Sequence, residues 1–347
     1  MTTRFRLALV GAGLITQEAH LPAALVSDKV EVAALIDPVV ERARSLARSY
    51  GISPRIAESV TEAFGYIDGA VIATPNHTHK DIAVACLEAG VATLIEKPLA
   101  SSLADGEAIV AAAQKTGAPV AVGYSTRFRD NIVLLKDLLA QSYFGQIRRF
   151  LHQFGTAGGW APLSAYNLKR DASGGGVLVV TGTHFLDRML HFWGYPSRVA
   201  LEDDSLGGPE ANCQAHFHYT QGFDGMARYS KTFRLPGGTA IETDRGVVLL
   251  RDTDEAEIVF YPRESQNVAQ VIQRRERPAA APSVFQLQIE DFVDACLTHQ
   301  SPRVDASQGL LSLKLLDDLY QHRSSYNQDW YRASKGPNHK LAEIACV

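Results

Sequence analysis

A glycine-rich segment close to the start of this 347-residue chain limits the folds that the chain can adopt. The apolar run Leu7 to Val10 leads into Gly11-Ala12-Gly13-Leu14-Ile15-Thr16, a G-x-G-x-x-G pattern with Thr16 in place of the third glycine. Gly11 permits a tight turn, and Gly13, which has no Cβ, lets a pyrophosphate approach backbone N–H groups at the positive end of a helix. The third glycine only eases helix-to-strand packing, so Thr16 weakens the pattern little. The sequence therefore predicts a dinucleotide-binding unit with loop contacts from Gly11, Gly13, Leu14 and Ile15.

Short apolar runs alternate with amphipathic stretches over residues 5–123, which is typical of a parallel sheet covered by helices on both faces. The runs are Leu7–Val10, Val32–Ile36, Ala70–Ala73, Thr93–Ile95 and Val120–Val122. Between them, Val39–Tyr50 and His79–Ala89 are rich in Ala, Glu, Arg and Leu, which favours helices. We therefore expect a doubly wound Rossmann domain over residues 1–125.

Asp37 ends the second predicted strand, 24 residues beyond Gly13, about where a carboxylate accepts hydrogen bonds from adenosine ribose hydroxyls. Such a carboxylate repels a 2′-phosphate and favours NAD over NADP. Arg42 and Arg44 on the following helix keep NADP open. The alternative for Asp37 is a turn or helix-cap residue before Pro38.

The second half of the chain has a different texture. From Val199 to Leu250 the hydrophobic pattern has a period of two, which predicts an antiparallel sheet. Over residues 211–219 one face is apolar and the other carries Asn212, Gln214, His216 and His218. Residues 263–282 are expected to form an exposed loop. Two amphipathic helices, the first with Phe285, Ile289, Phe292, Val293 and Cys296 and the second with Leu310, Leu311 and Leu319, then close the fold. The prediction is an α/β domain with a large, mostly antiparallel open sheet over residues 126–330, followed by a tail at 331–347.

The composition argues against several classes of partner. The formal net charge is −4 and 21% of residues are charged, which implies neither nucleic acid nor a membrane surface. No apolar run approaches the roughly 20 residues that span a bilayer, and no signal-peptide core is present, so we expect a cytoplasmic protein. Four cysteines far apart and histidine pairs without acidic or thiol partners at ligand spacing predict no metal site.

Glu96-Lys97-Pro98, directly after an apolar strand, resembles the Gfo/Idh/MocA oxidoreductases, the family of glucose-fructose oxidoreductase and inositol dehydrogenase. Ala73-Thr74-Pro75-Asn76-His77-Thr78-His79, the interdomain segment at 123–128, the glycines at 174–176 and the segment at 182–187 also resemble family blocks. The resemblance implies cofactor contacts from Thr74, Pro75, Asn76, His79, Glu96 and Lys97. It also supports a homodimer or homotetramer through the open sheet face that carries His216 and His218.

The resemblance implies an interdomain active site in which Lys97 and His184 meet the nicotinamide and a substrate hydroxyl or carbonyl. An imidazole suits the proton transfer of alcohol oxidation, and an ammonium stabilises a developing alkoxide. Substrate contacts are expected from Tyr124, Arg127, Trp160, Tyr166, Asn167, Thr181 and His184. The stretch at 160–171 mixes aromatic and polar side chains as a sugar pocket does, with a plain loop as the alternative.

One departure from the family pattern concerns the histidine. Family members acting on polyols carry an aspartate four residues before it, which orients the imidazole, whereas this chain has Val180. Ser125 similarly replaces an interdomain asparagine. The expected function is NAD(P)-dependent hydride transfer at a CH–OH group of a sugar, cyclitol or related polyol. The alternatives are elimination or hydrolysis at a glycosidic carbon with a recycled dinucleotide, and a non-catalytic sensor of NAD or a sugar.

Overall fold

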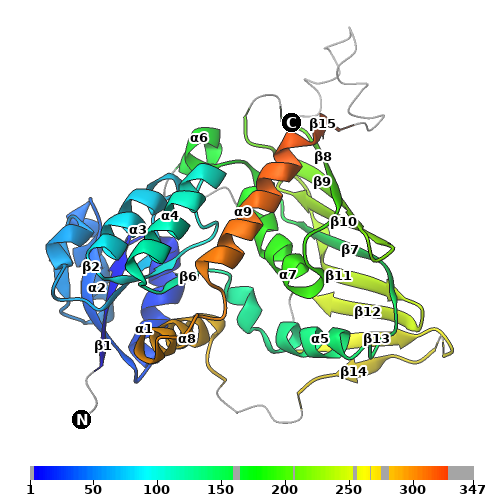
Figure 1. Cartoon of the computed structure of the whole chain (residues 1–347), viewed down its shortest axis with the longest axis horizontal. Coiled ribbons are helices and arrows are strands. Elements are labelled where there is room, and N and C mark those ends of the chain that lie inside the picture. Colours follow the sequence, from blue (N-terminus) through cyan, green and yellow to red (C-terminus); the bar gives the residue numbers. More distant parts are fainter. Residues whose placement is uncertain are drawn as a thin grey trace, which may run out of the picture.

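Two β-sheets organise the computed structural model, which describes residues 4–158, 165–205, 208–252, 256–265, 267–274 and 281–326 (Figure 1). The first sheet has six parallel strands in the order β3-β2-β1-β4-β5-β6. The second has nine strands in the order β14-β13-β12-β11-β7-β10-β9-β8-β15 and is mostly antiparallel. The predicted α/β class, with a Rossmann sheet and a large second sheet, is confirmed.

The strands of the first sheet match the predicted apolar runs closely. They are β1 (Phe5–Val10), β2 (Val30–Ile36), β3 (Arg55–Ala57), β4 (Gly69–Ile72), β5 (Ala92–Ile95) and β6 (Val120–Val122). Only the three-residue β3 was not predicted. The strand order reverses between β1 and β4, and in doubly wound sheets ligands bind in the crevice at that point.

Alternate residues of β1 pack on opposite faces of this sheet. Leu7 and Leu9 contact a cluster with α1 (Leu21–Val26), α2 (Val40–Tyr50) and α8 (Val284–Thr298). Ala8 and Val10 face the other side, where α3 (His79–Glu88) and α4 (Leu103–Thr116) cover the sheet. Helix α8 thus returns to the first sheet although it follows the second one in sequence. The division of the chain at residue 125 stays a prediction.

The second sheet begins with a strand that the periodicity did not reveal, β7 (Ile147–Gly155), which pairs in parallel with β10. The other strands are β8 (Arg198–Asp203), β9 (Asn212–Tyr219), β10 (Phe223–Ser230), β11 (Leu235–Thr243), β12 (Gly246–Arg251), β13 (Ile258–Pro262), β14 (Gln270–Ile272) and β15 (Arg323–Ser325). The expected loop at 263–282 is therefore wrong in part, because β14 pairs with β13 there. Its three residues are largely exposed at the sheet edge, so they carry no alternating pattern.

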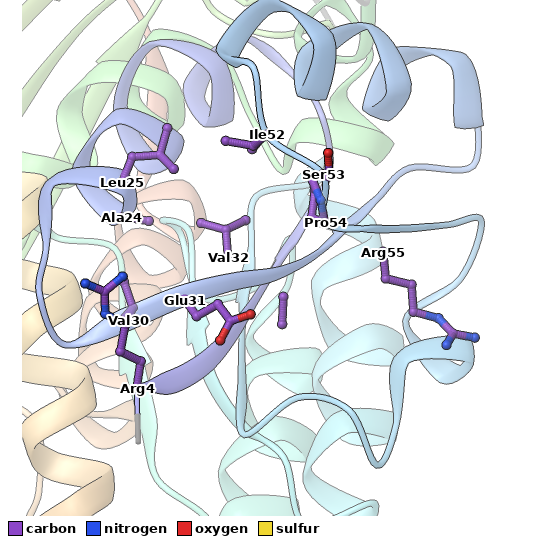
Figure 2. A pocket seen from close by; sticks show the side chains of 11 residues that line it. Arg4, Ala24, Leu25, Val30, Glu31, Val32, Ile52, Ser53, Pro54 and Arg55 are labelled. Carbon is purple, nitrogen blue, oxygen red and sulfur yellow. The ribbon is translucent and has the colours of Figure 1, made fainter. Parts of the chain in front are cut away.

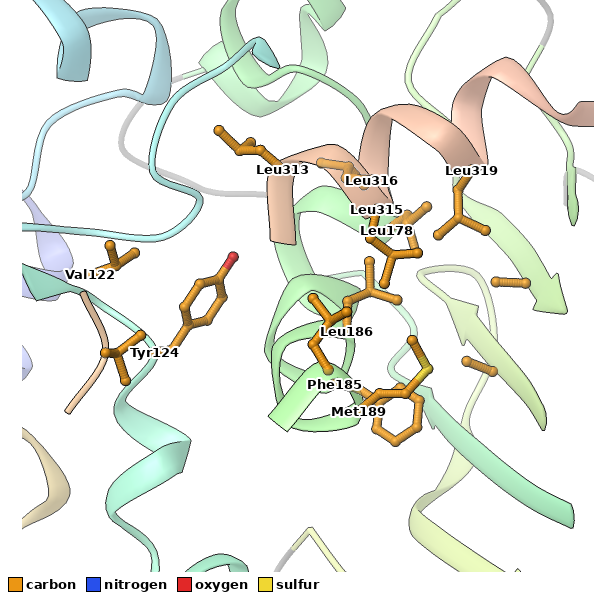
Figure 3. Packing of buried hydrophobic residues seen from close by; sticks show 14 of the residues in the cluster. Val122, Tyr124, Leu178, Phe185, Leu186, Met189, Leu313, Leu315, Leu316 and Leu319 are labelled. Atoms are coloured by element: carbon orange, nitrogen blue, oxygen red, sulfur yellow. The ribbon is translucent and has the colours of Figure 1, made fainter. Parts of the chain in front are cut away.

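Helices α5 (Asp130–Ala140), α7 (Thr183–Trp193) and α9 (Ala306–Gln321) lie on the side of the second sheet that faces the first (Figure 1). Figure 3 shows the core between the two sheets, to which α7 contributes Leu186 and Met189 and α9 contributes Leu315 and Leu319. This shared apolar cluster includes residues of both sheets, so it fixes the α7 backbone relative to the ends of β5 and β6.

No described helix covers the opposite face of the second sheet, and this face is less polar than β9 alone suggests. An apolar row crosses it through successive cross-strand partners, Met226, Leu151, Ala240, Leu249, Val259 and Val271. The first five are half-buried and Val271 is exposed. Within the described ranges, no helix is long and apolar enough to cross a membrane.

Candidate active site

The glycine loop follows β1 and opens η1 (Thr16–His20), a π-helical turn that runs directly into α1. Gly11 has φ +95°, and a Cβ there would lie 2.6 Å from the backbone oxygen of Ala73, so only glycine fits. A Cβ at Gly13 would meet nothing within 4 Å, which leaves the space that a pyrophosphate needs. Leu14 and Ile15 are partly exposed beside this space. The loop geometry therefore suits a dinucleotide.

Asp37 is nearly buried at the end of β2, and both of its carboxylate oxygens accept backbone hydrogen bonds. Ala12 N donates to Oδ2 over 2.9 Å, and Val39 N donates to Oδ1 over 2.8 Å. The carboxylate thus holds the glycine loop and forms the turn that was considered as its alternative role. Each oxygen has a second lone pair, so the same group can still accept ribose hydroxyls.

A cavity of about 1000 Å³ extends along the carboxyl ends of the first sheet's strands. Its volume lies at the upper end of the range for small-molecule sites. The lining includes predicted residues at both ends, namely Gly11, Gly13, Leu14, Ile15, Asp37, Thr74, Pro75, Asn76, Glu96, Lys97 and Tyr166. It also includes residues that the sequence did not single out, among them Gln17, Ser45, Glu58, Ser59, Val60 and Ile82. Arg42 lines it, whereas Arg44 does not and lies 3.9 Å from Glu41.

The segment after β4 forms η3 (Asn76–Thr78) and connects the two halves of the molecule. Asn76 Nδ2 donates to Ser173 O of the second half over 2.9 Å. His79 is fully buried, with Nε2 2.9 Å from Thr74 O and Nδ1 3.1 Å from Pro98 O. Thr74 and Asn76 therefore reach the cavity, while His79 is absent from its lining and ties the Thr74 loop to the chain beyond Lys97.

Glu96 and Lys97 follow β5 and stand at the inner end of the cavity. Glu96 Oε1 lies 2.9 Å from His20 Nε2, and Oε2 accepts a hydrogen bond from Lys97 N over 3.0 Å. Burial raises the pKa of the Glu96 carboxyl, but the hydrogen bond and charge of His20 and the charge of Lys97 bring it below its ordinary value. Glu96 therefore remains an anion next to the Lys97 ammonium.

Lys97 brings the two halves together at its side chain. Its Nζ donates to the backbone oxygen of Val180 over 2.9 Å. Val180 lies in η6 (Leu178–Gly182), one helical turn before His184 at the start of α7. Burial lowers the pKa of Lys97, the Glu96 charge opposes this, and Lys231 adds to the lowering. The valine that replaces the family aspartate therefore supplies a backbone acceptor to the lysine.

The His184 imidazole is half-buried, and its ring meets the Tyr124 ring edge-on at 6.2 Å between centroids. Burial lowers the pKa of His184 well below its ordinary value, and the positive charges of Lys97, Arg188 and Arg129 lower it further. Its Nδ1 has no hydrogen-bond partner within the part of the chain that the structure describes. The ring is consequently neutral at neutral pH.

Residues 5–124 match the family described as "Oxidoreductase family, NAD-binding Rossmann fold", GFO_IDH_MocA. This part of the chain is an NAD-binding Rossmann domain of the Gfo/Idh/MocA oxidoreductase family. The rhizopine catabolism protein MocA of Rhizobium meliloti is 28% identical over 323 residues, covering 91% of this chain and 94% of that protein. The D-glucoside 3-dehydrogenase of Escherichia coli is 23% identical over 343 residues, covering 91% and 94%.

A solved levoglucosan dehydrogenase in complex with NADH and levoglucosan has the same fold. Its TM-score is 0.81 at 17% identity, and the superposition covers 92% of this chain and 97% of that one. The chain thus carries an NAD-binding Rossmann domain of the Gfo/Idh/MocA type, and its broad activity is that of an NAD(P)-dependent oxidoreductase.

Two residues that were expected to contact the substrate have their polar groups directed away from the cavity. The Tyr124 ring is fully buried between β6, α7 and α9 (Figure 3). Arg127, in η4 (Ser125–Phe128), forms a buried ion pair with Asp187 of α7, with Nε 2.6 Å and Nη2 2.8 Å from its carboxylate oxygens. The structure therefore places Tyr124 behind His184 and uses Arg127 to fix α7.

The other predicted substrate residues come after Arg127 in the chain. Tyr166, in η5 (Ala165–Leu168), lines the cavity. Thr181 is half-buried within η6. Trp160 lies outside the described residues, as does the side chain of Asn167. Gly176 lets this region pack closely against Glu210, because a Cβ at Gly176 would lie 2.0 Å from Glu210 O.

A second hollow of about 340 Å³ lies at the β2–β3 edge of the first sheet (Figure 2). Leu25, Val32 and Ile52 form its apolar side, while Arg4 and Arg55 lie toward its rim (Figure 2). It shares no lining residue with the larger cavity. Apart from His79, the predicted cofactor residues therefore line the larger cavity, and none of them lines this hollow.

Proposed function

We propose that this protein transfers hydride between NAD and a secondary alcohol or ketone of a sugar, cyclitol or related polyol. One observation carries the proposal: the Lys97 ammonium reaches across from the first half of the chain to Val180 O, one helical turn from the His184 imidazole. The Lys97 cation lines the cavity, and the neutral His184 imidazole, which is outside the cavity lining, lies close enough to sense its charge. The relatives include a D-glucoside dehydrogenase and a dehydrogenase solved with levoglucosan, which support a sugar-like substrate.

The charge states of His184 and Lys97 determine their proposed roles in the reaction. Bound NAD would supply the hydride acceptor for the alcohol carbon. His184, neutral because of burial and nearby cations, takes up the hydroxyl proton. Lys97 stabilises the negative charge that develops on the substrate oxygen. In the reverse direction the imidazolium returns the proton to the ketone oxygen.

NAD is the proposed dinucleotide, with NADP as the weaker ligand. Asp37 lies in the cavity lining with a free lone pair on each oxygen for the ribose hydroxyls, and its charge repels a 2′-phosphate. Arg42 is the cation in the same lining that would offset this repulsion. Fluorescence titration with NADH and NADPH tests the preference, and tighter binding of NADPH would overturn it.

The function itself is tested with purified protein, both dinucleotides and a panel of polyols, cyclitols and keto-sugars. Formation or consumption of NADH at 340 nm in the presence of one of them is the expected result. Release of a leaving group from a glycoside without net change in that absorbance would replace the proposal with dinucleotide-assisted elimination. Tight NADH binding with no turnover across the whole panel would replace it with a sensor.

We also propose that the open face of the second sheet joins copies of this chain in a homodimer or homotetramer. The apolar row from Met226 to Val271 supports this, since a single-copy protein would leave it in water. His216 and His218 lie on the same face, at its β9 end. Light scattering on the purified protein measures the copy number, and a monomer at micromolar concentration would overturn the proposal.

A further inference from the structure

We propose that His20 is a positioning residue for Lys97, acting through the Glu96 carboxylate that it fixes as the counter-charge of the lysine. The inference rests on the proposed role of Lys97 in hydride transfer. It assigns a task to a buried histidine outside the cavity lining, on the helical turn that opens from the glycine loop.

The surroundings of His20 leave its imidazole one polar contact among the residues that the structure describes. The side chain is fully buried, and Nε2 lies 2.9 Å from Glu96 Oε1. Phe285 of α8 meets the ring edge-on at 5.2 Å between centroids. The other nitrogen, Nδ1, has no hydrogen-bond partner within the described ranges. The ring is therefore held by packing and directed at one carboxylate oxygen.

Glu96 links His20 to the backbone of Lys97. Its second oxygen accepts the hydrogen bond from Lys97 N, so the carboxylate joins η1 to the peptide of Lys97. The backbone at Gly123 packs tightly against Glu96 and Lys97, because a Cβ at Gly123 would lie 2.9 Å from Glu96 Cα and 3.0 Å from Lys97 N. One hydrogen-bonded path thus runs from the turn behind the glycine loop to the lysine.

The charges around this path are few. Glu96 faces His20 and Lys97, while Lys97 faces Glu96, Lys231 and, across the cleft, His184. From α8, Phe285 meets His20 with an apolar ring. The only carboxylate that faces Lys97 in these contacts is therefore Glu96.

Removing the His20 donor would leave a buried carboxylate oxygen without a partner, which favours the protonated acid. A neutral Glu96 no longer offsets the burial of Lys97. The ammonium would then lose its proton at a lower pH, and its backbone would lose an anchor. The variant His20→Gln tests the charge by itself, because the amide still donates to Glu96 Oε1 but no longer adds the positive charge that lowers the pKa of Glu96.

The experiment follows the 13Cε resonance of Lys97, assigned by its loss in Lys97→Met, through a pH titration of the NAD-loaded protein. We expect His20→Gln to lower the pKa of Lys97 by about one unit. The basic limb of the kcat profile should move down by a similar amount, while the Kd for NADH stays within about twofold. His152→Gln is the matched control, because His152 is an equally buried histidine on β7, bonded to Thr239 and not to Glu96.

An unchanged Lys97 titration in His20→Gln would overturn the inference, as would an equal shift in His152→Gln. If His20→Gln does not fold, Glu96→Gln takes its place and must produce the same lowering. The titration needs no substrate, so it stands even if no polyol is oxidised. If the wild-type protein turns over no substrate but His20→Gln still lowers the pKa of Lys97, the proposed function is contradicted. The link from His20 through Glu96 to Lys97 would still hold.

Discussion

The buried ion pair between Arg127 and Asp187 separates a structural role for Arg127 from a substrate-binding one. The arginine side chain is 4% exposed and the aspartate 0%, with two hydrogen bonds of 2.6 and 2.8 Å between them. Arg127→Met keeps the length of the side chain but removes its charge and donors. Asp187 would then be a buried carboxylate without its cation.

Breaking a buried pair in this way costs about 3–5 kcal/mol in the free energy of unfolding. Burial already raises the pKa of Asp187 while Arg127 lowers it, so losing Arg127 raises it further. A carboxyl with a raised folded-state pKa binds a proton on folding, and the resulting penalty grows as pH rises above the unfolded pKa of about 3.9. The stability deficit of Arg127→Met should therefore be largest at neutral pH and shrink toward pH 4.

Urea denaturation followed by tryptophan fluorescence at several pH values measures this deficit. The double variant Arg127→Met/Asp187→Leu should regain most of the stability, because an apolar pair replaces a buried ion pair at little cost. It should also regain turnover if Arg127 serves only to hold α7. A deficit below about 1 kcal/mol in Arg127→Met would show that this ion pair does not stabilise the fold. A stable but inactive double variant would return Arg127 to the substrate site.

Three further variants test the loop, the base and the open sheet face. Gly13→Ala should keep the wild-type melting temperature, because its Cβ meets open space, yet weaken NADH binding at least tenfold in a fluorescence titration; unchanged affinity would contradict the pyrophosphate assignment. Val180→Asp should place a carboxylate near His184 and move the acid limb of the kcat/KM profile to higher pH by about one unit, and a profile that stays in place would show that the two groups do not interact. Leu151→Arg, in the middle of the apolar row, should convert the assembly to monomers in light scattering, whereas an unchanged mass would move the interface elsewhere.

The first sheet was predictable because its signals are local. Each buried parallel strand is an apolar run of its own, and the glycine loop identifies the first of them. In contrast, β7 pairs in parallel with β10, 75 residues further along, and its alternation is interrupted by exposed arginines. The edge strands β3 and β14 are too short to show a period. Pairing between distant segments leaves no mark in a sequence window.

The same distinction applies to the site. Asp37 and Lys97 were found because they directly follow strands whose ends form the cavity. Tyr124 and Arg127 occupy similar positions in the sequence, but their surroundings come from α7, some 60 residues away. His20 was not singled out, because its partner Glu96 is 76 residues away. Proximity to a site follows from sequence pattern, whereas the direction of a side chain depends on tertiary contacts.

If the Lys97 ammonium acts on the substrate oxygen next to the His184 base, then Lys97→Met should slow turnover without weakening dinucleotide binding. The half-buried Lys80, whose Nζ lies 3.2 Å from Asp105 on α4, gives the matched control Lys80→Met. With a turned-over polyol, Lys97→Met should lose about 10²–10³-fold or more in kcat while its Kd for NADH stays within a few-fold of wild type. Turnover at the level of Lys80→Met, or a parallel loss of NADH binding, would contradict the account.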